Sequence, residues 1–205
     1  MSISYNYKYD YIIYGGSISS IIAAIHYKQN GNSVLLLNKY GFLGGGITEC
    51  LNLVQNIDLG TKLPIITQTI IDKLGNSNFV NIANSSYLVN PEMLKFVLQD
   101  LVLEHKIDLL FHVVPISINT NSIMLMGKEG KIELSANSIL DYCDNKVLSY
   151  LTNSKQSLLG IYNIVVKAKS INELYNIFPS SEIISISNNR FLIETIINFD
   201  NLTEV

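Results

Sequence analysis

Short apolar runs alternate with one helical repeat over the first 40 residues of the chain. Residues 11–14 read Tyr-Ile-Ile-Tyr before a glycine pair, and residues 33–37 read Ser-Val-Leu-Leu-Leu. Apolar runs of this length without polar alternation are typical of strands that are buried on both faces. Between them, isoleucines recur at helical spacing over residues 17–30, and Gly31 is placed to end a helix. The pattern predicts a β-α-β unit.

Two further helices are predicted in the middle of the chain. Residues 90–92, Asn-Pro-Glu, combine an N-cap residue, a proline at the first helical position and an acid in the first turn. Apolar residues then recur at helical spacing, so a helix is predicted over residues 90–105. A second helix is predicted over residues 65–74, ending at Gly75, and the Asn- and Ser-rich residues 76–86 are predicted as a loop.

The remaining apolar segments are predicted as strands. A turn at residues 128–130 divides residues 117–134 into antiparallel strands. The other predicted strands cover residues 107–114, 138–141, 162–167, 183–186 and 191–197. The order of elements predicts an α/β fold with further strands in the tail, and 205 residues fit one domain or one domain with a small appendage.

Composition narrows the range of partners and compartments. The net charge is −3 and Arg190 is the only arginine, so no basic stripe for nucleic acid is visible. Hydrophobic residues make up 48% and charged residues 15%, which an extensive partner interface would explain; the many Asn and Tyr residues explain it equally well by solvating the surface.

The cysteines and the uncharged N-terminal run bear on localisation. Cys50 and Cys143 lie far apart in the sequence, so neither a disulfide framework nor a zinc site is expected, and a reducing compartment is the default. Residues 11–27 carry no charged side chain, but the glycine pair and three serines interrupt the run, and it is short for a membrane span. We therefore expect a cytoplasmic protein that neither enters a membrane nor binds nucleic acid.

A glycine-rich turn follows the first predicted strand, where dinucleotide-binding folds hold a pyrophosphate. The usual pattern is G-x-G-x-x-G, in which glycines let the backbone approach the phosphates and the following helix supplies N–H groups. Here Gly15 stands at the first glycine position and Gly16 at the variable position after it, while Ser17 and Ser20 replace the other two glycines, with Ser19 between them. The motif predicts a phosphate-binding turn with altered chemistry.

Longer stretches of the chain resemble the FAD-dependent oxidoreductase family, flavoproteins with two dinucleotide-binding domains. In that family an acid after the second strand is followed by a loop like Tyr-Gly-Phe-Leu-Gly-Gly, and residues 38–48 here read Asn-Lys-Tyr-Gly-Phe-Leu-Gly-Gly-Gly-Ile-Thr. Residues 90–95 resemble the family's helix before a strand that passes the adenine. Residues 139–144 resemble a strand that ends in Asp-Ala-Thr-Gly-Asp, of which Asp141 is kept. The resemblance covers residues 8–150.

The resemblance implies a division of the chain and a set of cofactor contacts. It implies a Rossmann-like FAD-binding domain over residues 1–150, with an insertion at 49–89, followed by a partial, mainly antiparallel β substrate-domain segment over 151–205. Asn38 stands where the family has an acid for the ribose hydroxyls and can still hydrogen-bond one. The implied FAD-contacting residues are Gly15, Gly16, Ser17, Ser19, Ser20, Asn38, Lys39, Gly44, Gly45, Thr48, Val114 through its backbone, and Asp141.

Two main functions follow from the resemblance and stay open at this point. The first is an FAD-dependent oxidoreductase, as a subunit of a complex acting on a small molecule or a peptide, with no nameable catalytic base. The second is a non-catalytic flavoprotein-derived subunit that scaffolds or completes the site of a partner enzyme. The partner would be another copy of the chain or a longer flavoprotein homologue. An NAD-binding module ranks last because Asn38 replaces the ribose-binding acid, and the three histidines show no metal-ligand spacing.

Overall fold

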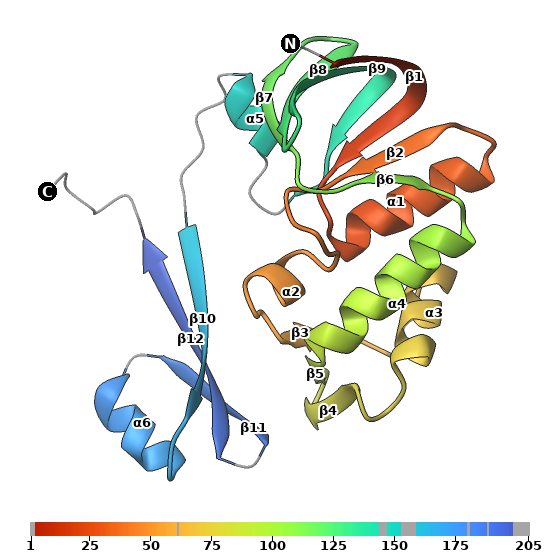
Figure 1. The fold of residues 1–205 in the computed structure, drawn as a ribbon. Helices are drawn as coiled ribbons and strands as arrows, with labels where there is room; N and C mark the ends of the chain where they lie inside the picture. The colour runs from red at the N-terminus through yellow and green to blue at the C-terminus, as the bar shows by residue number, and fades with distance from the viewer. Residues whose placement is uncertain are drawn as a thin grey trace, which may run out of the picture. The chain divides into compact units, whose positions relative to one another are not determined.

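The computed structural model describes residues 3–60, 62–143, 147–152, 159–179, 181–187 and 189–198. The chain divides into two compact units (Figure 1). The larger unit comprises Met1–Glu49 and Leu53–Ser154, and the smaller one comprises Cys50–Asn52 and Lys155–Val205. Because the relative placement of the units is not determined, each is described by itself.

A six-stranded mixed sheet forms the centre of the larger unit (Figure 1). Its order is β6-β2-β1-β9-β8-β7, and the first four strands run parallel while β8 and β7 are antiparallel to their neighbours. The strands are β1 (Ile3–Tyr14), β2 (Val34–Leu37), β6 (Asp108–Leu110), β7 (Val114–Ile118), β8 (Ser122–Gly127) and β9 (Gly130–Asp141). This arrangement confirms the predicted α/β fold.

The register of the parallel strands brings their carboxyl ends into one row. Tyr14, the last residue of β1, pairs with Leu37 of β2 and with Asp141 of β9, and Leu37 also pairs with Leu110 of β6. Four loops that are far apart in the sequence therefore start side by side at this edge. In open α/β sheets, ligands bind outside the carboxyl ends of the strands.

The longer helices of the larger unit lie on one face of this sheet (Figure 1). α1 (Ile18–Gln29) contacts β1, β2 and α4 (Pro91–Glu104), and α4 contacts α2 (Gly46–Glu49) and α3 (Ile65–Leu74). The predicted helices over 17–30, 65–74 and 90–105 are confirmed, since their caps read as expected: Asn90 accepts hydrogen bonds from the first turn of α4, and Gly75 follows α3 at φ +67°.

Side chains of the curved β7–β8–β9 segment close the opposite face. Buried residues of β8 and β9, among them Ile123 and Leu134, pack with Ile12 and Leu35 of the parallel strands. Leu148, on α5 (Val147–Leu151), joins the same core. The end of β1, residues 12–14, and the whole of β2 are thus buried on both faces, which accounts for their uninterrupted apolar sequences.

One loop prediction and two strand predictions need correction. Residues 76–86 are only in part a loop, because β4 (Phe79–Ala83) and β5 (Ser86–Val89) form an antiparallel sheet with β3 (Val54–Asn56). The Phe79 and Tyr87 rings of this sheet stack with centroids 4.4 Å apart. The loop prediction, which rested on the Asn and Ser residues, did not include this contact.

The strand predicted over residues 107–114 is interrupted, and the one over 138–141 is not separate. β6 ends at Leu110, and His112 adopts a left-handed φ of 58° before β7 begins at Val114 and pairs with β8. Residues 138–141 are the end of β9, which continues because its polar residues alternate outward.

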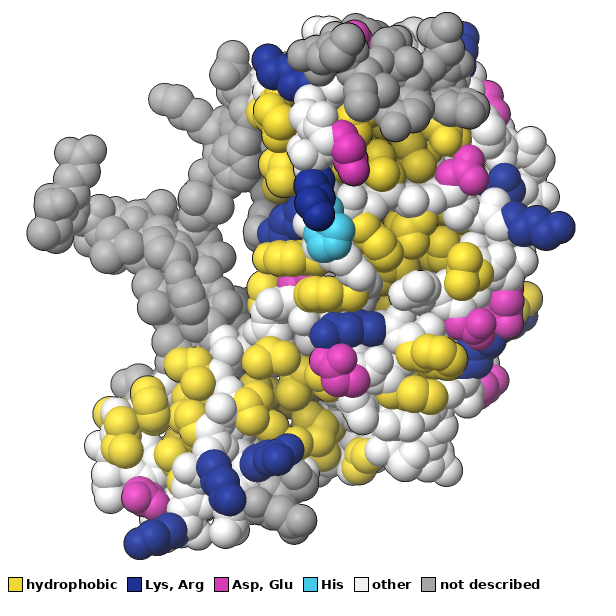
Figure 2. All heavy atoms as spheres, in the orientation of Figure 1, with side chains coloured by type: hydrophobic (Ala, Val, Ile, Leu, Met, Phe, Trp, Pro, Cys, Tyr) yellow, Lys and Arg dark blue, Asp and Glu magenta, His cyan; other side chains and the backbone are white. Residues whose placement is uncertain are grey.

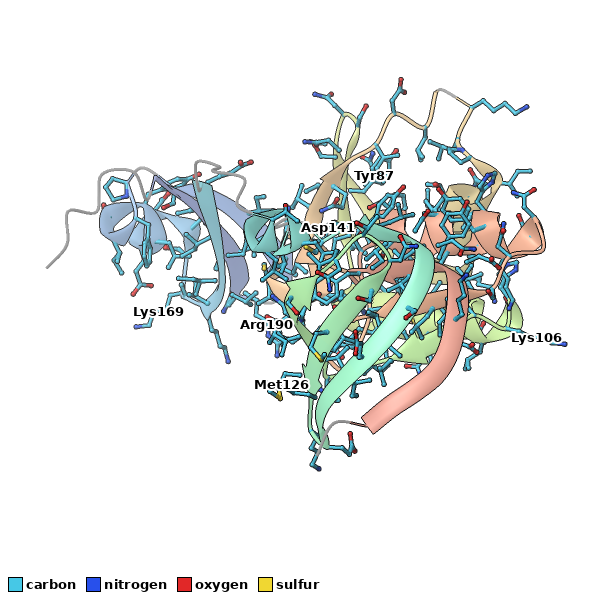
Figure 3. All side chains as sticks on the ribbon, turned by 90° about the horizontal axis from the view of Figure 1, so that it is seen from above. Tyr87, Lys106, Met126, Asp141, Lys169 and Arg190 are labelled. Atoms are coloured by element: carbon cyan, nitrogen blue, oxygen red, sulfur yellow. The ribbon has the colours of Figure 1, made fainter. Side chains whose placement is uncertain are left out.

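The smaller unit is a three-stranded antiparallel sheet with one helix. It consists of β10 (Leu159–Lys167), α6 (Ile171–Ile177), β11 (Glu182–Ser187) and β12 (Arg190–Asn198), in the sheet order β10-β12-β11. Leu174 of α6 packs on Ile183, Phe191 and Ile193. The strands predicted in the tail are confirmed, whereas α6 was not predicted. Lys169, between β10 and α6, and Arg190, the first residue of β12, are labelled in Figure 3.

Charged side chains are interspersed on the molecular surface. On the face shown in Figure 2, lysine and arginine side chains alternate with acidic ones and with apolar side chains. Within the part of the chain that the structure describes, no helix is long and apolar enough to cross a membrane.

Candidate functional site

The turn after β1 is packed against the chain that leaves β9. The Gly15 N–H donates to the Leu37 carbonyl at 2.9 Å, and Gly15 has a φ of +125°. A Cβ atom at Gly15 would lie 2.7 Å from the Cys143 nitrogen and 2.8 Å from the Tyr142 carbonyl carbon. Glycine is therefore required here both by the backbone conformation and by the close approach of another segment.

The Asn38 side chain is turned into the loop that follows β2. It is only 3% exposed, its Nδ2 donates to the Phe42 carbonyl at 2.7 Å, and its Oδ1 accepts from the Lys39 N–H at 3.0 Å. A Cβ atom at Gly16 would lie 2.5 Å from Asn38 Nδ2. Asn38 therefore holds the loop 38–42 against the first glycine turn, and its amide both donates to and accepts from the chain itself.

A second glycine loop is hydrogen-bonded to the first. The Gly44 N–H donates to the Gly16 carbonyl at 2.6 Å. Thr48, which is 6% exposed, donates from Oγ1 to the Leu43 carbonyl at 3.0 Å and lies against Gly44, where a Cβ atom would overlap it. Gly45 has a left-handed φ of 56°. The two loops thus form one backbone-bonded surface at the carboxyl edge of the sheet.

Ser17 is the N-cap of α1. Its Oγ accepts from the Ser20 N–H at 3.3 Å and donates to the Tyr142 carbonyl at 2.9 Å. Ser20 is fully buried, and its hydroxyl donates to the Ser17 carbonyl at 2.6 Å, which explains how a serine is accommodated at a close-packed glycine position. The N–H groups of Ile18 and Ser19 donate to no residue that the structure describes.

Asp141, labelled in Figure 3, closes the loop that leaves β9. Its Oδ1 accepts from the Cys143 N–H at 3.1 Å and from the Cys143 thiol at 2.8 Å. Its Oδ2 accepts from the Leu148 N–H at 2.8 Å, within α5. The carboxylate therefore accepts three hydrogen bonds from its own chain.

Tyr14 lies directly behind this loop, at the end of β1. Its side chain is 2% exposed, and burial raises the pKa of its hydroxyl well above the usual range, with Cys143 and Asp141 adding to the rise. The hydroxyl stays protonated at neutral pH.

Lys39 and Val114 lie at the rim of this surface. The Lys39 ammonium is 3.9 Å from a Glu49 carboxylate oxygen and 4.6 Å from the centroid of the Tyr40 ring. Val114 begins β7 and is 47% exposed, whereas the backbone contact to the loop after β2 comes from its neighbour, the Val113 N–H, which donates to the Asn38 carbonyl at 3.3 Å.

Contacts between these residues bring most of the sequence-predicted positions together. Gly16 contacts Asn38 and Gly44, and Ser17 binds Ser20 directly and reaches the loop after Asp141 through Tyr142. Ser19 is exposed at the first turn of α1, and its Oγ is 2.9 Å from that of Ser17. The contacts that sequence reasoning missed come from the carbonyls of Phe42 and Tyr142, because a backbone acceptor leaves no mark in a sequence.

A small cavity lies elsewhere in the larger unit, between α1, α2, α3, α4 and the β3–β5–β4 sheet. Its volume is about 60 Å³. Ligand pockets for drug-sized molecules occupy about 300–1,000 Å³, so this cavity cannot hold a dinucleotide. It is lined by Ile18, Ile47, Gln55, Ile57, Thr67, Ile70, Ile71, Leu74, Phe79, Val89 and Leu94.

The fold of the chain is similar to the folds of several solved proteins. A geranylgeranyl bacteriochlorophyll reductase-like protein from Thermoplasma acidophilum superposes with a TM-score of 0.68 at 9% identity, covering 94% of this chain and 57% of the other. The myxobacterial chondrochloren halogenase CndH, a variant of the FAD-dependent halogenases, gives 0.60 at 13% identity, covering 94% and 53%. Glycine oxidase from Geobacillus kaustophilus gives 0.57 at 13% identity, covering 95% and 74%.

The chain spans only about half the length of the first two of these proteins, and at such identities the likeness concerns the fold. A search of curated protein sequences found no match. The family model of the FAD-dependent oxidoreductases, however, matches residues 10–151, close to the range over which the sequence resembles that family. The chain belongs to the FAD-dependent oxidoreductase family.

Proposed function

We propose that this chain binds FAD at the carboxyl edge of its parallel sheet and serves as a subunit of an oxidoreductase complex acting on a small molecule or a peptide. One observation carries the proposal: the Gly15–Ser17 turn, the Gly44 loop and the chain after β9 converge on the N-terminus of α1. Their backbones are joined by the Gly44–Gly16 hydrogen bond and by the close approach at Gly15.

The backbone at this point suits the pyrophosphate of a dinucleotide. α1 is twelve residues long, has no acidic residue in its first turn, and leaves the N–H groups of Ile18 and Ser19 without an acceptor among the described residues. A helix N-terminus with free N–H groups attracts a negative charge through hydrogen bonds and through its dipole. Lys39 lies at the rim of the same edge, where its ammonium is paired with the Glu49 carboxylate at 3.9 Å.

The side chains suit the cofactor less well than the backbone does. Asn38 and Asp141 both bind their own chain, so only part of their hydrogen-bonding capacity remains for a ribose hydroxyl. The bound flavin would supply the redox chemistry by accepting a hydride or electrons from the substrate. The contribution of this chain is to bind and orient the dinucleotide through Gly15, Gly16, Ser17, Gly44 and Gly45, and no catalytic base is assigned.

The same engagement of polar side chains favours a second candidate function. A subunit that has ceased to bind a cofactor gains stability when the polar groups of its former site bind one another, because buried polar groups without partners are costly. In that case the chain stabilises or completes a partner's site, the partner being a second copy or a longer flavoprotein homologue. In either role we place the protein in the cytoplasm.

Release of the bound cofactor from protein purified together with its natural partners tests the first function. After denaturation of the complex, mass spectrometry of the small-molecule fraction should detect FAD. The separated chain, titrated with FAD and FMN, should prefer FAD, since only FAD has the pyrophosphate that the α1 terminus would bind. A complex free of flavin, together with a chain that does not bind FAD, would leave the scaffolding role.

A further inference from the structure

Ser17 occupies the second glycine position of the G-x-G-x-x-G pattern, so it adds a side chain where the pattern has none. Ser17 is 8% exposed, and its backbone at φ −69° and ψ 163° is extended, so the position does not demand a glycine. What the serine adds is one hydroxyl group between the N-terminus of α1 and the chain that leaves β9.

That hydroxyl is fully occupied by the protein itself. A serine hydroxyl has one hydrogen to donate and two lone pairs to accept with. The hydrogen goes to the Tyr142 carbonyl, and the oxygen accepts from the Ser20 N–H. The Ser19 hydroxyl, 2.9 Å away, supplies the second donor once the Ser17 hydrogen is committed to Tyr142.

The Ser20 N–H is one of the groups that a phosphate takes at a helix N-terminus. While Ser17 accepts from it, a phosphate at the same terminus must displace the Ser17 oxygen or bind with one hydrogen bond fewer. The displaced hydroxyl would also have to leave the Tyr142 carbonyl, since the two bonds share one oxygen atom.

We infer that Ser17 is an internal substitute for the nucleotide phosphate and sets the affinity of the chain for dinucleotides. The inference rests on the proposed function for the identity of the ligand, and it concerns the residue that limits binding. Removal of the hydroxyl frees the Ser20 N–H before the ligand arrives, so the ligand no longer has to displace the cap.

Titration of four variants with FAD and with ADP tests this role, ADP being a probe that carries the pyrophosphate without the flavin. Ser17→Ala removes the hydroxyl, Ser17→Gly also restores the fingerprint, and Ser17→Thr keeps the hydroxyl. Asn90→Ala is the matched control, because Asn90 caps α4 by accepting from the Glu92 and Met93 N–H groups.

Ser17→Ala should bind both probes about fivefold more tightly than the natural chain, the factor that corresponds to one N-cap hydrogen bond, and Ser17→Gly should also bind both more tightly, by a smaller factor. Ser17→Thr and Asn90→Ala should bind as the natural chain does. In the ligand-free protein, the amide hydrogen of Ser20 should exchange faster in Ser17→Ala than in the natural chain, a result that does not depend on any ligand.

Equal or weaker binding by both Ser17→Ala and Ser17→Gly would overturn the inference, because the hydroxyl would then be neutral or would itself donate to the phosphate. The fate of the proposed function is separate. If the natural chain binds FAD and the variants gain nothing, the inference falls and the function stands. If only the variants bind, the inference stands and the function of the natural chain as a flavoprotein falls; if none binds, both fall.

Discussion

Gly15→Ala tests whether the chain after β9 is held against the first glycine turn. The new methyl group would lie 2.7 Å from the Cys143 nitrogen and within 2.9 Å of the carbonyl carbon and oxygen of Tyr142, all of them backbone atoms. Gly31→Ala is the matched control. Gly31 also has a positive φ, +84°, but an added Cβ there would meet nothing within 4 Å.

Both substitutions put an alanine at a positive φ, but only Gly15→Ala also causes a steric clash. An L-residue with left-handed backbone costs about 1–2 kcal/mol, which is the whole effect expected for Gly31→Ala. Gly15→Ala adds overpacking against fixed backbone, about 1–3 kcal/mol, for a total loss of about 2–5 kcal/mol in the free energy of unfolding. The lower entropy of the unfolded chain with alanine is common to both variants and cancels in the comparison.

Thermal and urea denaturation followed by circular dichroism measures the difference. In a chain of this size each kcal/mol shifts Tm by about 2–4 °C, so Gly15→Ala should melt roughly 2–12 °C below Gly31→Ala. Equal losses in the two variants would refute the contact between Gly15 and the Tyr142–Cys143 backbone, and with it the convergence of segments on which the proposed site depends.

Three other predictions concern side chains. Asn38→Ala should lower the free energy of unfolding by about 1–3 kcal/mol in urea titrations, because a carbonyl and an N–H in the loop after β2 lose their partner. Ile70→Ala should enlarge the apolar cavity and cost about 2–5 kcal/mol, whereas Ile65→Ala, at a side chain that is 80% exposed, should change stability by about 0.5 kcal/mol or less. Hydrogen bonds from Ser33 hold the pKa of Asp10 below its usual 3.8, so Asp10 stabilises the fold above that pH. This contribution should disappear as the pH falls through the lower folded value, and the difference in Tm between the natural chain and Asp10→Asn should vanish there.

The parts of the fold that the sequence predicted are those with local causes. Helices α1, α3 and α4 begin and end within a residue of their predicted limits because caps and glycines act on neighbouring atoms. The β4–β5 pair escaped prediction because its Asn and Ser residues are also loop formers, and only pairing across the hairpin decides between the two. The sequence predicted two strands in place of β9, because Ser135 and Asn137 interrupt the apolar residues; both are exposed in one continuous strand.

For the candidate site, the sequence predicts the glycine positions but not the hydrogen-bond partners of the polar side chains. Whether Asn38 faces a ligand or its own loop depends on where the Phe42 carbonyl lies, and the sequence does not carry that information. The same holds for Ser17 and the Tyr142 carbonyl, which are 125 residues apart.

Because β1 pairs with β9, one edge of β1 stays unpaired until β9 has been synthesised. Tyr14 pairs with Leu37, which follows it closely, but its other neighbour is Asp141, 127 residues later. At about 5–20 residues per second, a ribosome needs roughly 6–25 s to produce the second partner. Throughout that interval the apolar Ile12–Ile13 segment of β1 has an unpaired edge, and such edges pair readily with other chains. The nascent chain is therefore most prone to aggregate before residue 141 emerges, and slower translation of the β3–β8 region prolongs that exposure.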